Sequence, residues 1–362
     1  MSEAPLCKVV DIVFVRFELK DLSVQKEYLE HFGMHLVRET QDAIYYKGSG
    51  SAPFLYTASK GSENRYVSAG YRVDNYSELK NLAAHFDVVI EQNQESGGGH
   101  KVTLSDPDGL GIEVFHGLEL SDVEIAPEPI LNTSANKSRI NELQRFGKGS
   151  DEWVLKDDEW VYGLKAGVMR LGHTAINVAN APASMQWYQD TLGFLITDNL
   201  MMPDGNCLGA FMRVDQGDVP VDHHVMNIIG TMPGKEQYAG SFGHAGFEVN
   251  ESVDSLMAGH FHMKTQDKYY HEWGIGRHLL GSQMYDYWRD PQGFTLEHWT
   301  DGDLLDATVP TTDVPARDLI MAQYGPLAPA TFGLSMPSED VDAYRDENAS
   351  LSEMVKMFEA GK

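Results

Sequence analysis

The chain of 362 residues is poor in cysteine and in basic residues. Only Cys7 and Cys207 are present, which excludes a disulfide framework and a zinc site built on cysteines. Lysine and arginine together number 28 against 54 aspartates and glutamates, so the formal net charge is −26. A surface this acidic repels phosphate backbones and anionic lipid, so we expect no nucleic-acid partner and no membrane partner.

Long apolar runs are also missing. No uncharged apolar stretch reaches the length of a transmembrane helix. The start of the chain carries Glu3, Asp11 and Arg16 where a signal peptide has an unbroken apolar core. The apolar fraction of 42% is nevertheless sufficient for a folded protein with a sizeable core. We therefore expect a soluble, reduced protein in the cytoplasm.

One pattern occurs twice, and the rest of the chain is arranged around it. Residues 106–113 read Asp-Pro-x-Gly-x-x-x-Glu, and residues 290–297 repeat this pattern. Proline and glycine fit a tight turn between two strands. Residues 171–194 also repeat the strand, helix and glycine layout of residues 11–34. A repeated sequence unit indicates a repeated supersecondary structure.

The two copies differ in the residues that carry chemistry. Aligning Gly193 with Gly33, and Ala245-Gly246 with Ala69-Gly70, pairs three positions: His173 with Val13, His244 with Ser68 and Glu297 with Glu113. Two imidazoles therefore appear together in the C-terminal copy only. This difference predicts one chemical site per chain, in the C-terminal half.

His173, His244 and Glu297 have the composition of a metal site. Two neutral imidazoles and one carboxylate on separate strands form the facial triad of non-haem Fe(II) proteins, which leaves three coordination positions open. Zinc accepts the same ligand types. Mn(II) accepts them too, and neither the ligands nor their spacing separates it from Fe(II).

Further polar residues accompany the triad. A buried histidine beside a metal is a candidate acid–base group, because its pKa is near neutrality. His223 and His224 are adjacent, and spacing alone does not choose between them. Tyr287 precedes Glu297 on the strand across the turn, and His278 precedes Tyr287, so both side chains are candidates for the same cleft.

The ordered set resembles a known family. It consists of His173 in LGHTAINV, the His223-His224 pair, His244 in FGHAGFEV, and GRH, Tyr287, DPxG and Glu297. Over residues 8–300 this set is similar to type I extradiol catechol dioxygenases of the vicinal oxygen chelate superfamily. The resemblance implies an α+β fold of four βαβββ modules. These are paired into two domains, each a curled mixed sheet around a cleft.

The resemblance also implies roles. His173, His244 and Glu297 match the ligands of Fe(II), with Mn(II) as the alternative metal. His223 fits the family's acid–base pattern better than His224, which is the second choice. Tyr287 matches the active-site tyrosine, and His278 matches the histidine that lies near the bound catechol. The implied partners are a catechol-type substrate and O2, and a homo-oligomer is expected.

The repeat and the composition, read with this resemblance, predict four segments. Residues 1–120 form an N-terminal pair of modules without a metal site, and residues 121–167 form a linker with a helix near 140–146. Residues 168–302 form the catalytic pair, and residues 303–362 form a proline-containing C-terminal extension that ends in a helical pattern.

Two other classes of function fit parts of the pattern. The first is another metalloenzyme on the same scaffold, either a keto-acid dioxygenase of the 4-hydroxyphenylpyruvate type or a glyoxalase-type isomerase. The second is a metal-free binding module that traps a small molecule in the cleft. Stoichiometric iron or manganese separates the enzymes from the binding module.

Overall fold

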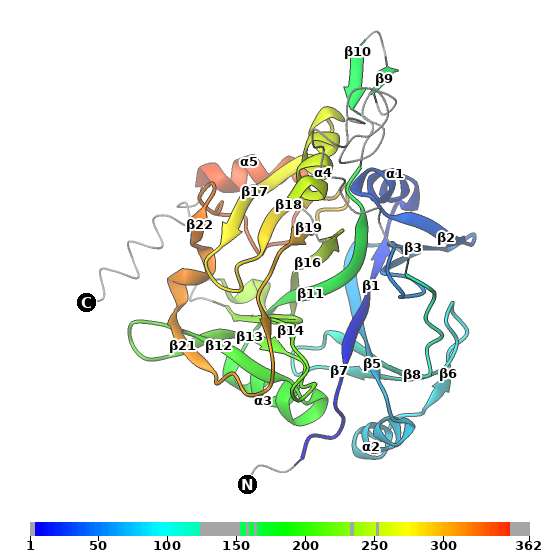
Figure 1. Cartoon of the computed structure of the whole chain (residues 1–362), viewed down its shortest axis with the longest axis vertical. Helices are drawn as coiled ribbons and strands as arrows, with labels where there is room; N and C mark the ends of the chain where they lie inside the picture. The colour runs from blue at the N-terminus through cyan, green and yellow to red at the C-terminus, as the bar shows by residue number, and fades with distance from the viewer. Residues whose placement is uncertain are drawn as a thin grey trace, which may run out of the picture.

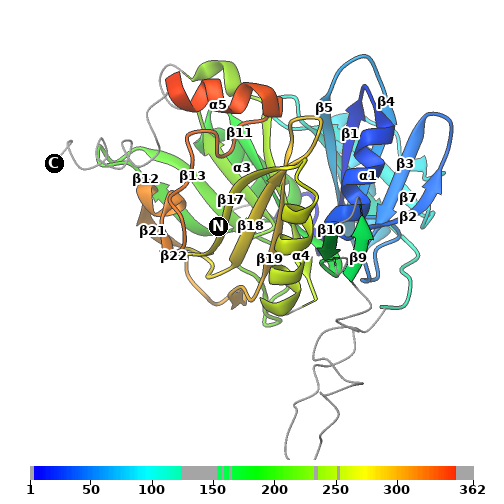
Figure 2. The same ribbon diagram turned by 90° about the horizontal axis from the view of Figure 1, so that it is seen from above.

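The structure is a computed structural model, and it describes residues 4–123, 153–156, 159–162, 165–231, 235–250 and 253–347. Most of the predicted linker, including the helix expected near 140–146, lies outside these residues. Two large mixed sheets stand side by side, one from each half of the chain (Figures 1 and 2). No described helix is both long enough and apolar enough to cross a membrane.

The N-terminal half forms an eight-stranded sheet in the order β2-β3-β4-β1-β5-β8-β7-β6. Its elements are β1 (Asp11–Leu19), α1 (Leu22–Phe32), β2 (His35–Glu39), β3 (Ala43–Lys47), β4 (Tyr56–Lys60), β5 (Arg65–Val73), α2 (Tyr76–Phe86), β6 (Glu91–Gln92), β7 (His100–Ser105) and β8 (Gly111–His116). A short hairpin of β9 (Trp153–Lys156) and β10 (Glu159–Tyr162) follows.

The C-terminal half forms a ten-stranded sheet in the order β21-β12-β13-β15-β11-β16-β19-β18-β17-β22. Its elements up to residue 300 are β11 (Val168–Val178), α3 (Ala181–Leu192), β12 (Leu195–Met201), β13 (Cys207–Arg213), β14 (Val221–Asp222), β15 (Met226–Gly230), the 3-10 turn η3 (Glu236–Tyr238), β16 (Ser241–Val249), α4 (Val253–Thr265), β17 (Tyr270–His278), β18 (Met284–Arg289) and β19 (Thr295–Thr300).

The predicted α+β fold of four βαβββ modules is confirmed. The modules begin at β1, β5, β11 and β16, and each continues with one helix and three strands, with the short β14 inserted in the third. In each half the first strands of the two modules pair antiparallel at the middle of the sheet, β1 with β5 and β11 with β16. The sheet of each half is therefore a pair of modules joined through their first strands.

The two repeated turns hold the halves together. Asp290 Oδ1 accepts hydrogen bonds from the backbone N–H groups of Gln292 and Phe294, which stabilise the turn. Asp290 Oδ2 accepts a hydrogen bond of 2.9 Å from the side-chain amide of Gln25 in α1. In the other half, Asp106 caps its turn in the same way and accepts from Tyr188 of α3 at 3.1 Å. Each turn thus reaches the first helix of the opposite half, and this reciprocal contact explains why both copies keep the motif.

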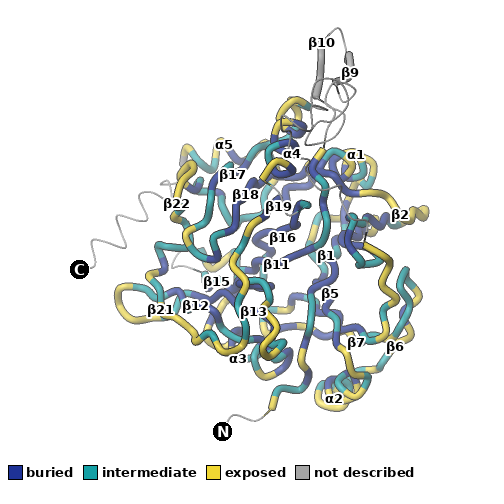
Figure 3. The backbone as a smooth tube through the Cα atoms, in the orientation of Figure 1, coloured by how far each residue is buried: buried dark blue, intermediate teal, exposed yellow. Residues whose placement is uncertain are grey.

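The core runs through both halves. One continuous cluster of buried apolar side chains contains Phe17 and Tyr56 from the first sheet and Phe242 and Phe294 from the second. The rings of Phe17 and Phe294 lie 4.7 Å apart. Buried residues concentrate along the central strands, whereas β2 at the outer edge is exposed (Figure 3). The strands that carry the triad therefore belong to the best-buried part of the molecule.

The C-terminal extension is not a separate layer. It contains β20 (Leu304–Leu305), β21 (Thr312–Pro315), the 3-10 helix η4 (Ala316–Ile320), β22 (Ala322–Tyr324) and α5 (Ser338–Glu347). β21 pairs with β12 and β22 pairs with β17, so the extension supplies both edge strands of the ten-stranded sheet.

Candidate metal centre

Three neighbouring strands bring the predicted ligands together. β16 lies between β11 and β19, and Gly246 of β16 pairs with His173 on one side and with Glu297 on the other. A side chain at Gly246 would overlap the His173 ring, since an added Cβ would lie 2.2 Å from it. His244 precedes this glycine by two residues on the same face of the strand. The glycine therefore makes the room in which the three side chains meet.

The three candidate ligand atoms converge on one point. His173 Nε2 lies 3.2 Å from His244 Nε2 and 2.9 Å from Glu297 Oε2, and His244 Nε2 lies 3.6 Å from the same oxygen. Ligands on one face of an octahedron, each about 2.1 Å from the metal, lie about 3.0 Å apart. All three residues are buried, and Glu297 Oε1 has no hydrogen-bond partner among the described residues. The group fits a divalent cation.

The N-terminal copy shows what a similar carboxylate does without a metal. Glu113 occupies the place of Glu297 and pairs with Gly70, as Glu297 pairs with Gly246. Its carboxylate accepts from Arg16 at 2.7 Å, from Lys101 at 2.6 Å and from Ser68 at 2.6 Å. Two fixed cations thus neutralise the buried charge in this copy. In the C-terminal copy the ion-pair partners of the carboxylate, among the described residues, are all histidines, so a bound cation would supply the missing positive charge.

The predicted pairing of His173 with Val13 is wrong by one residue. Phe14 pairs with Gly70 as His173 pairs with Gly246, and the Phe14 ring would meet a Cβ at Gly70 at the same 2.2 Å. The reason is that α3 has 12 residues and α1 has 11, so counting back from the glycines that end these helices shifts the alignment.

Electrostatics favour the protonation states that bind metal. Burial lowers the pKa of His244 to about 3, although the charge of Glu297 opposes the shift. The imidazole is therefore neutral and keeps a lone pair for a metal. Burial alone would raise the pKa of Glu297, but the charge and hydrogen bond of His173 outweigh it and lower the pKa below its usual range.

The adjacent histidines face different surroundings. His224 lines the small cavity beside the triad, and its ring centroid lies 4.3 Å from that of His173. His223 points away, with Nε2 at 2.8 Å from Asp198 Oδ2, and its Nδ1 lies 3.2 Å from His224 Nδ1. Both residues lie between β14 and β15, so a strand period of two does not describe them. The geometry therefore favours His224, the second choice, as the group beside the metal.

Tyr287 and His278 lie together at the other side of the same cavity. Tyr287 pairs directly with Glu297 across β18 and β19. Its hydroxyl oxygen lies 2.8 Å from His278 Nε2, which is 3.8 Å from Glu297 Oε1. Burial raises the pKa of Tyr287 well above its ordinary value and lowers the pKa of His278. The cavity thus contains a neutral phenol and a neutral imidazole.

Two histidines outside the predicted site form a cluster of their own. His260 Nδ1 and His271 Nε2 lie 3.1 Å and 2.8 Å from Asp286 Oδ1, and Trp288 donates to Asp286 Oδ2 at 2.6 Å. This second His-His-Asp group also has the spacing of a metal site. Its carboxylate is already satisfied by three donors, so hydrogen bonding accounts for the cluster.

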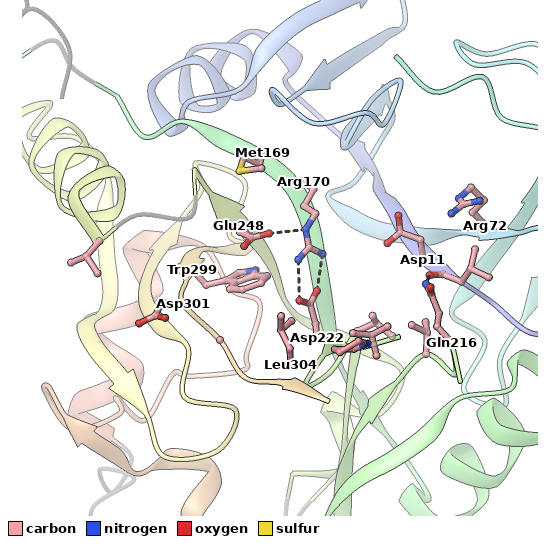
Figure 4. A pocket seen from close by; sticks show the side chains of 17 residues that line it. Asp11, Arg72, Met169, Arg170, Gln216, Asp222, Glu248, Trp299, Asp301 and Leu304 are labelled. Carbon is pink, nitrogen blue, oxygen red and sulfur yellow. Dashed lines mark hydrogen bonds and ion pairs between the residues drawn. The ribbon is translucent and has the colours of Figure 1, made fainter. Parts of the chain in front are cut away.

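The space at the triad is small, and a roomier cavity lies elsewhere. The cavity beside the triad has a volume of about 20 Å³. A cavity of about 720 Å³ lies at the junction of the two sheets and contains the Arg170 ion pairs with Asp222 and Glu248 (Figure 4). None of the described residues that line it is a histidine, and Trp299 separates it from His173, whose ring is 6.1 Å away. The larger cavity is therefore not the site of the triad.

Several residues of the site carry no signal in the sequence. Asp198 and Asn227 lie in strands, Leu319 in the 3-10 helix η4 and Phe332 in a loop, all without a motif. Only the folded chain places them beside the triad or its histidine pair. Phe211 lines the cavity against His224, but an aromatic residue in a strand is too common to mark a site.

Comparison with known proteins agrees with this architecture. "Metapyrocatechase 2" of Cupriavidus necator is 23% identical over 337 residues, covering 91% of this chain and 95% of that protein. The "Iron-dependent extradiol dioxygenase" of Rhodococcus jostii (strain RHA1) is 23% identical over 203 residues, covering 53% of this chain and 57% of that protein.

Solved structures share the fold. The Mn(II)-bound glyoxalase from Novosphingobium aromaticivorans matches with a TM-score of 0.68 at 20% identity, over 91% of this chain and 96% of that chain. A variant of homoprotocatechuate 2,3-dioxygenase from B. fuscum matches with a TM-score of 0.65 at 18% identity, over 87% of this chain and 78% of that chain. Residues 170–298, which hold the whole triad, match the model of the "Glyoxalase/Bleomycin resistance protein/Dioxygenase superfamily". Over these residues the chain is similar to that superfamily.

Proposed function

We propose that this chain is an extradiol dioxygenase that opens a catechol ring with O2 at an Fe(II) centre. The observation that carries the proposal is the convergence of His173, His244 and Glu297. Both histidines of this triad line a small cavity together with His224 and Tyr287. The relatives named as metapyrocatechase and as an iron-dependent extradiol dioxygenase support it. Residues 168–302 would be the catalytic pair of modules, and residues 1–120 a pair without metal.

The triad would hold the metal. Fe(II), when bound, offers open positions to the two oxygens of a catechol and to O2, and Mn(II) accepts the same ligands. The carbon–carbon bond beside the diol breaks, and both atoms of O2 enter the ring-opened semialdehyde product. The side chains around the metal would transfer protons and orient the substrate.

Hydrogen bonding supports a role for His224 as proton acceptor. Asp198 is a carboxylate and can only accept, so His223 donates to it from Nε2 and is left with an accepting Nδ1. His224 then donates from Nδ1 to His223 and keeps its lone pair on Nε2. We propose that His224 takes a proton from a catechol hydroxyl and returns it later, and that His223 positions it.

Tyr287 and His278 would orient the substrate. Both are buried and neutral, and their mutual hydrogen bond of 2.8 Å fixes the two side chains. One of the two groups donates to the other, so the pair keeps one O–H or N–H that can be donated to a substrate oxygen. Burial also excludes water from this side of the cavity.

The test is anaerobic loading with Fe(II), followed by O2 uptake with a panel of catechols. One O2 consumed per catechol, with a yellow ring-opened product that contains both labelled oxygen atoms, would support the proposal. Bound metal without O2 uptake on any catechol would favour the glyoxalase-type isomerase or the keto-acid oxygenase. If no stoichiometric metal is bound, the metal-free binding module is the remaining candidate function. The expectations of a homo-oligomer and of a cytoplasmic location stay predictions, which sedimentation and cell fractionation test.

A further inference from the structure

An apolar cavity adjoins the candidate metal centre. It has a volume of about 170 Å³ and shares Asn227, His244, Leu319 and Phe332 with the small cavity beside the triad. Its remaining walls are mainly aliphatic, with Leu208 and Ile229 from the sheet. The two spaces are therefore neighbouring parts of one cleft, one with the metal ligands and one almost without charge.

We propose that this apolar cavity receives an uncharged, apolar substituent of the catechol ring whose oxygens face the triad. The inference rests on the proposed extradiol activity and specifies its substrate class. The cavity at the triad, at about 20 Å³, has room for little more than one water molecule. An apolar cavity of about 150 Å³ is enough to bind benzene in another protein. The adjoining 170 Å³ therefore suits a propyl group or a ring.

The polar groups of this cavity are few, and most are already engaged. Asn177 donates to Ser241 at 3.1 Å and to the Gly333 carbonyl at 2.9 Å. Lys235 is the one cation among the described residues that line the cavity, and it donates to Tyr344 at 2.8 Å. A carboxylate on the substituent would lose its hydration without meeting an uncommitted cation, which disfavours acidic catechols.

Asn227 marks the place where the two spaces meet. It is 3% exposed, and its Oδ1 has no hydrogen-bond partner among the described residues. A buried acceptor of this kind is costly unless a donor reaches it. A ring hydroxyl at this point would supply the donor, which fits a ligand with its polar end at the triad and its apolar end in the larger cavity.

The C-terminal extension builds much of the apolar wall. Its contribution comes from η4, the segment after β22, and α5: Ala316, Leu319, Ile320, Ala330, Phe332, Gly333, Leu334 and Tyr344. None of these residues belongs to the candidate metal ligands. The size of the accepted substituent would therefore be set by a segment outside the four modules.

The test compares substrates of matched size on the Fe(II)-loaded full chain. The substrates are catechol, 3-propylcatechol, 4-propylcatechol and 3-(3,4-dihydroxyphenyl)propionate. We expect kcat/KM for one propylcatechol to exceed the values for catechol and for the propionate by on the order of tenfold, because three more carbons are buried without a charge.

Ala330→Phe fills the cavity, and Ala307→Phe is the matched control on an exposed position of the same extension. Ala330→Phe should lose the preference for the propyl group, and an unchanged circular dichroism spectrum and one metal ion per chain should report its correct folding. Ala307→Phe should keep the propyl preference of the natural chain. A second readout is calorimetric binding of propylbenzene to the metal-free protein, which should disappear in Ala330→Phe only.

The outcomes separate this inference from the proposed activity. Ring opening of catechol without a propyl preference and without propylbenzene binding would overturn the substrate class and leave the dioxygenase. A higher kcat/KM for the propionate than for both propylcatechols would also overturn the proposed substrate class. Propylbenzene binding that Ala330→Phe abolishes, together with no O2 uptake on any catechol, would support the apolar site and overturn the dioxygenase.

Discussion

At the residue scale, Glu297 and Glu113 form a natural pair for comparison, since they occupy corresponding places in the two halves. Glu297→Gln removes the anionic ligand of the triad. We expect the loss of stoichiometric iron and of all O2 uptake, because two imidazoles alone do not compensate a divalent cation. Metal content measured by inductively coupled plasma mass spectrometry after Fe(II) loading checks this.

Glu113→Gln is the matched control. It should keep one metal ion per chain, because Arg16 and Lys101 neutralise that carboxylate without a metal. It should also lower the free energy of unfolding, since Arg16 and Lys101 each lose their ion pair with this carboxylate in a part-buried setting, and Arg16 keeps only its ion pair with Glu95. Loss of iron from Glu113→Gln, or its retention in Glu297→Gln, would contradict the assignment of one site to the C-terminal half.

His224→Phe tests the acid–base role. We expect it to bind one metal ion per chain and to lose about 10²–10⁴-fold in kcat, the usual contribution of a general acid–base group. His223→Phe should lose about 10–100-fold, because His223 acts through its hydrogen bond to His224. The check is kcat as a function of pH in both variants. A larger loss in His223→Phe would return the role to His223.

Residue-level prediction from sequence succeeded where strand geometry applies and failed where it does not. Glu297 lies on the face opposite Leu296 and His298, as alternation along the strand predicts, with Leu296 in the core and His298 bonded to Phe32. His223 and His224 lie outside the strands, so alternation could not orient them. Their orientation depends on Asp198, whose contact with His223 no local pattern reveals.

At the scale of elements, the turn at Asp290 carries a prediction on pH. Burial raises the pKa of Asp290 to about 6, although hydrogen bonds from Phe294, Gln25 and Gln292 oppose the shift. In the unfolded chain an aspartate has a pKa of about 3.9. The stabilising effect of the protonated carboxyl is therefore complete below pH about 4, and it is lost as pH rises through about 6.

Asp290→Asn should remove this pH dependence. Its carbonyl oxygen can accept from the turn, and the Gln25 amide can reverse to accept from it, since Gln25 Oε1 has no described partner. Relative to the natural chain, the free energy of unfolding should rise between pH 4 and pH 8, by up to about 3 kcal/mol at 1.36 kcal/mol per pKa unit. Urea unfolding of both proteins at pH 4 and at pH 8 measures this change. If the difference in free energy of unfolding between the variant and the natural chain is the same at both pH values, the raised pKa of Asp290 is contradicted.

Most elements could be predicted from local sequence. The strand, helix and glycine layout of residues 11–34 is found as β1, α1 and the left-handed Gly33 that ends this helix. The edge strands β21 and β22 could not be predicted, because each has only a few residues and owes its conformation to a partner far away in the chain. Propensity acts locally, whereas these strands depend on tertiary pairing.

At the scale of the whole molecule, the continuous core predicts one cooperative transition. Apolar side chains of both halves form a single cluster, so neither half unfolds without exposing the core of the other. A bound metal at 100 times its dissociation constant adds about 2.7 kcal/mol to the free energy of unfolding. Removing the metal with a chelator should therefore lower the Tm of this single transition.

Calorimetry with and without chelator measures the effect, and Glu297→Gln is the control in which the chelator should change nothing. Two separate transitions, only one of them sensitive to the chelator, would contradict coupling between the halves. A single transition with the same Tm in both conditions would contradict metal binding to the folded state.

The extension closes both edges of the catalytic sheet and also lines the apolar part of the cleft, whereas every candidate ligand lies within the repeated modules. Under the proposed function, reactivity and selectivity would be encoded in separable stretches of the gene. Exchanging residues 303–362 between relatives would then transplant the preference for a ring substituent while leaving the reaction as it was. A new specificity could arise by changes within one short segment.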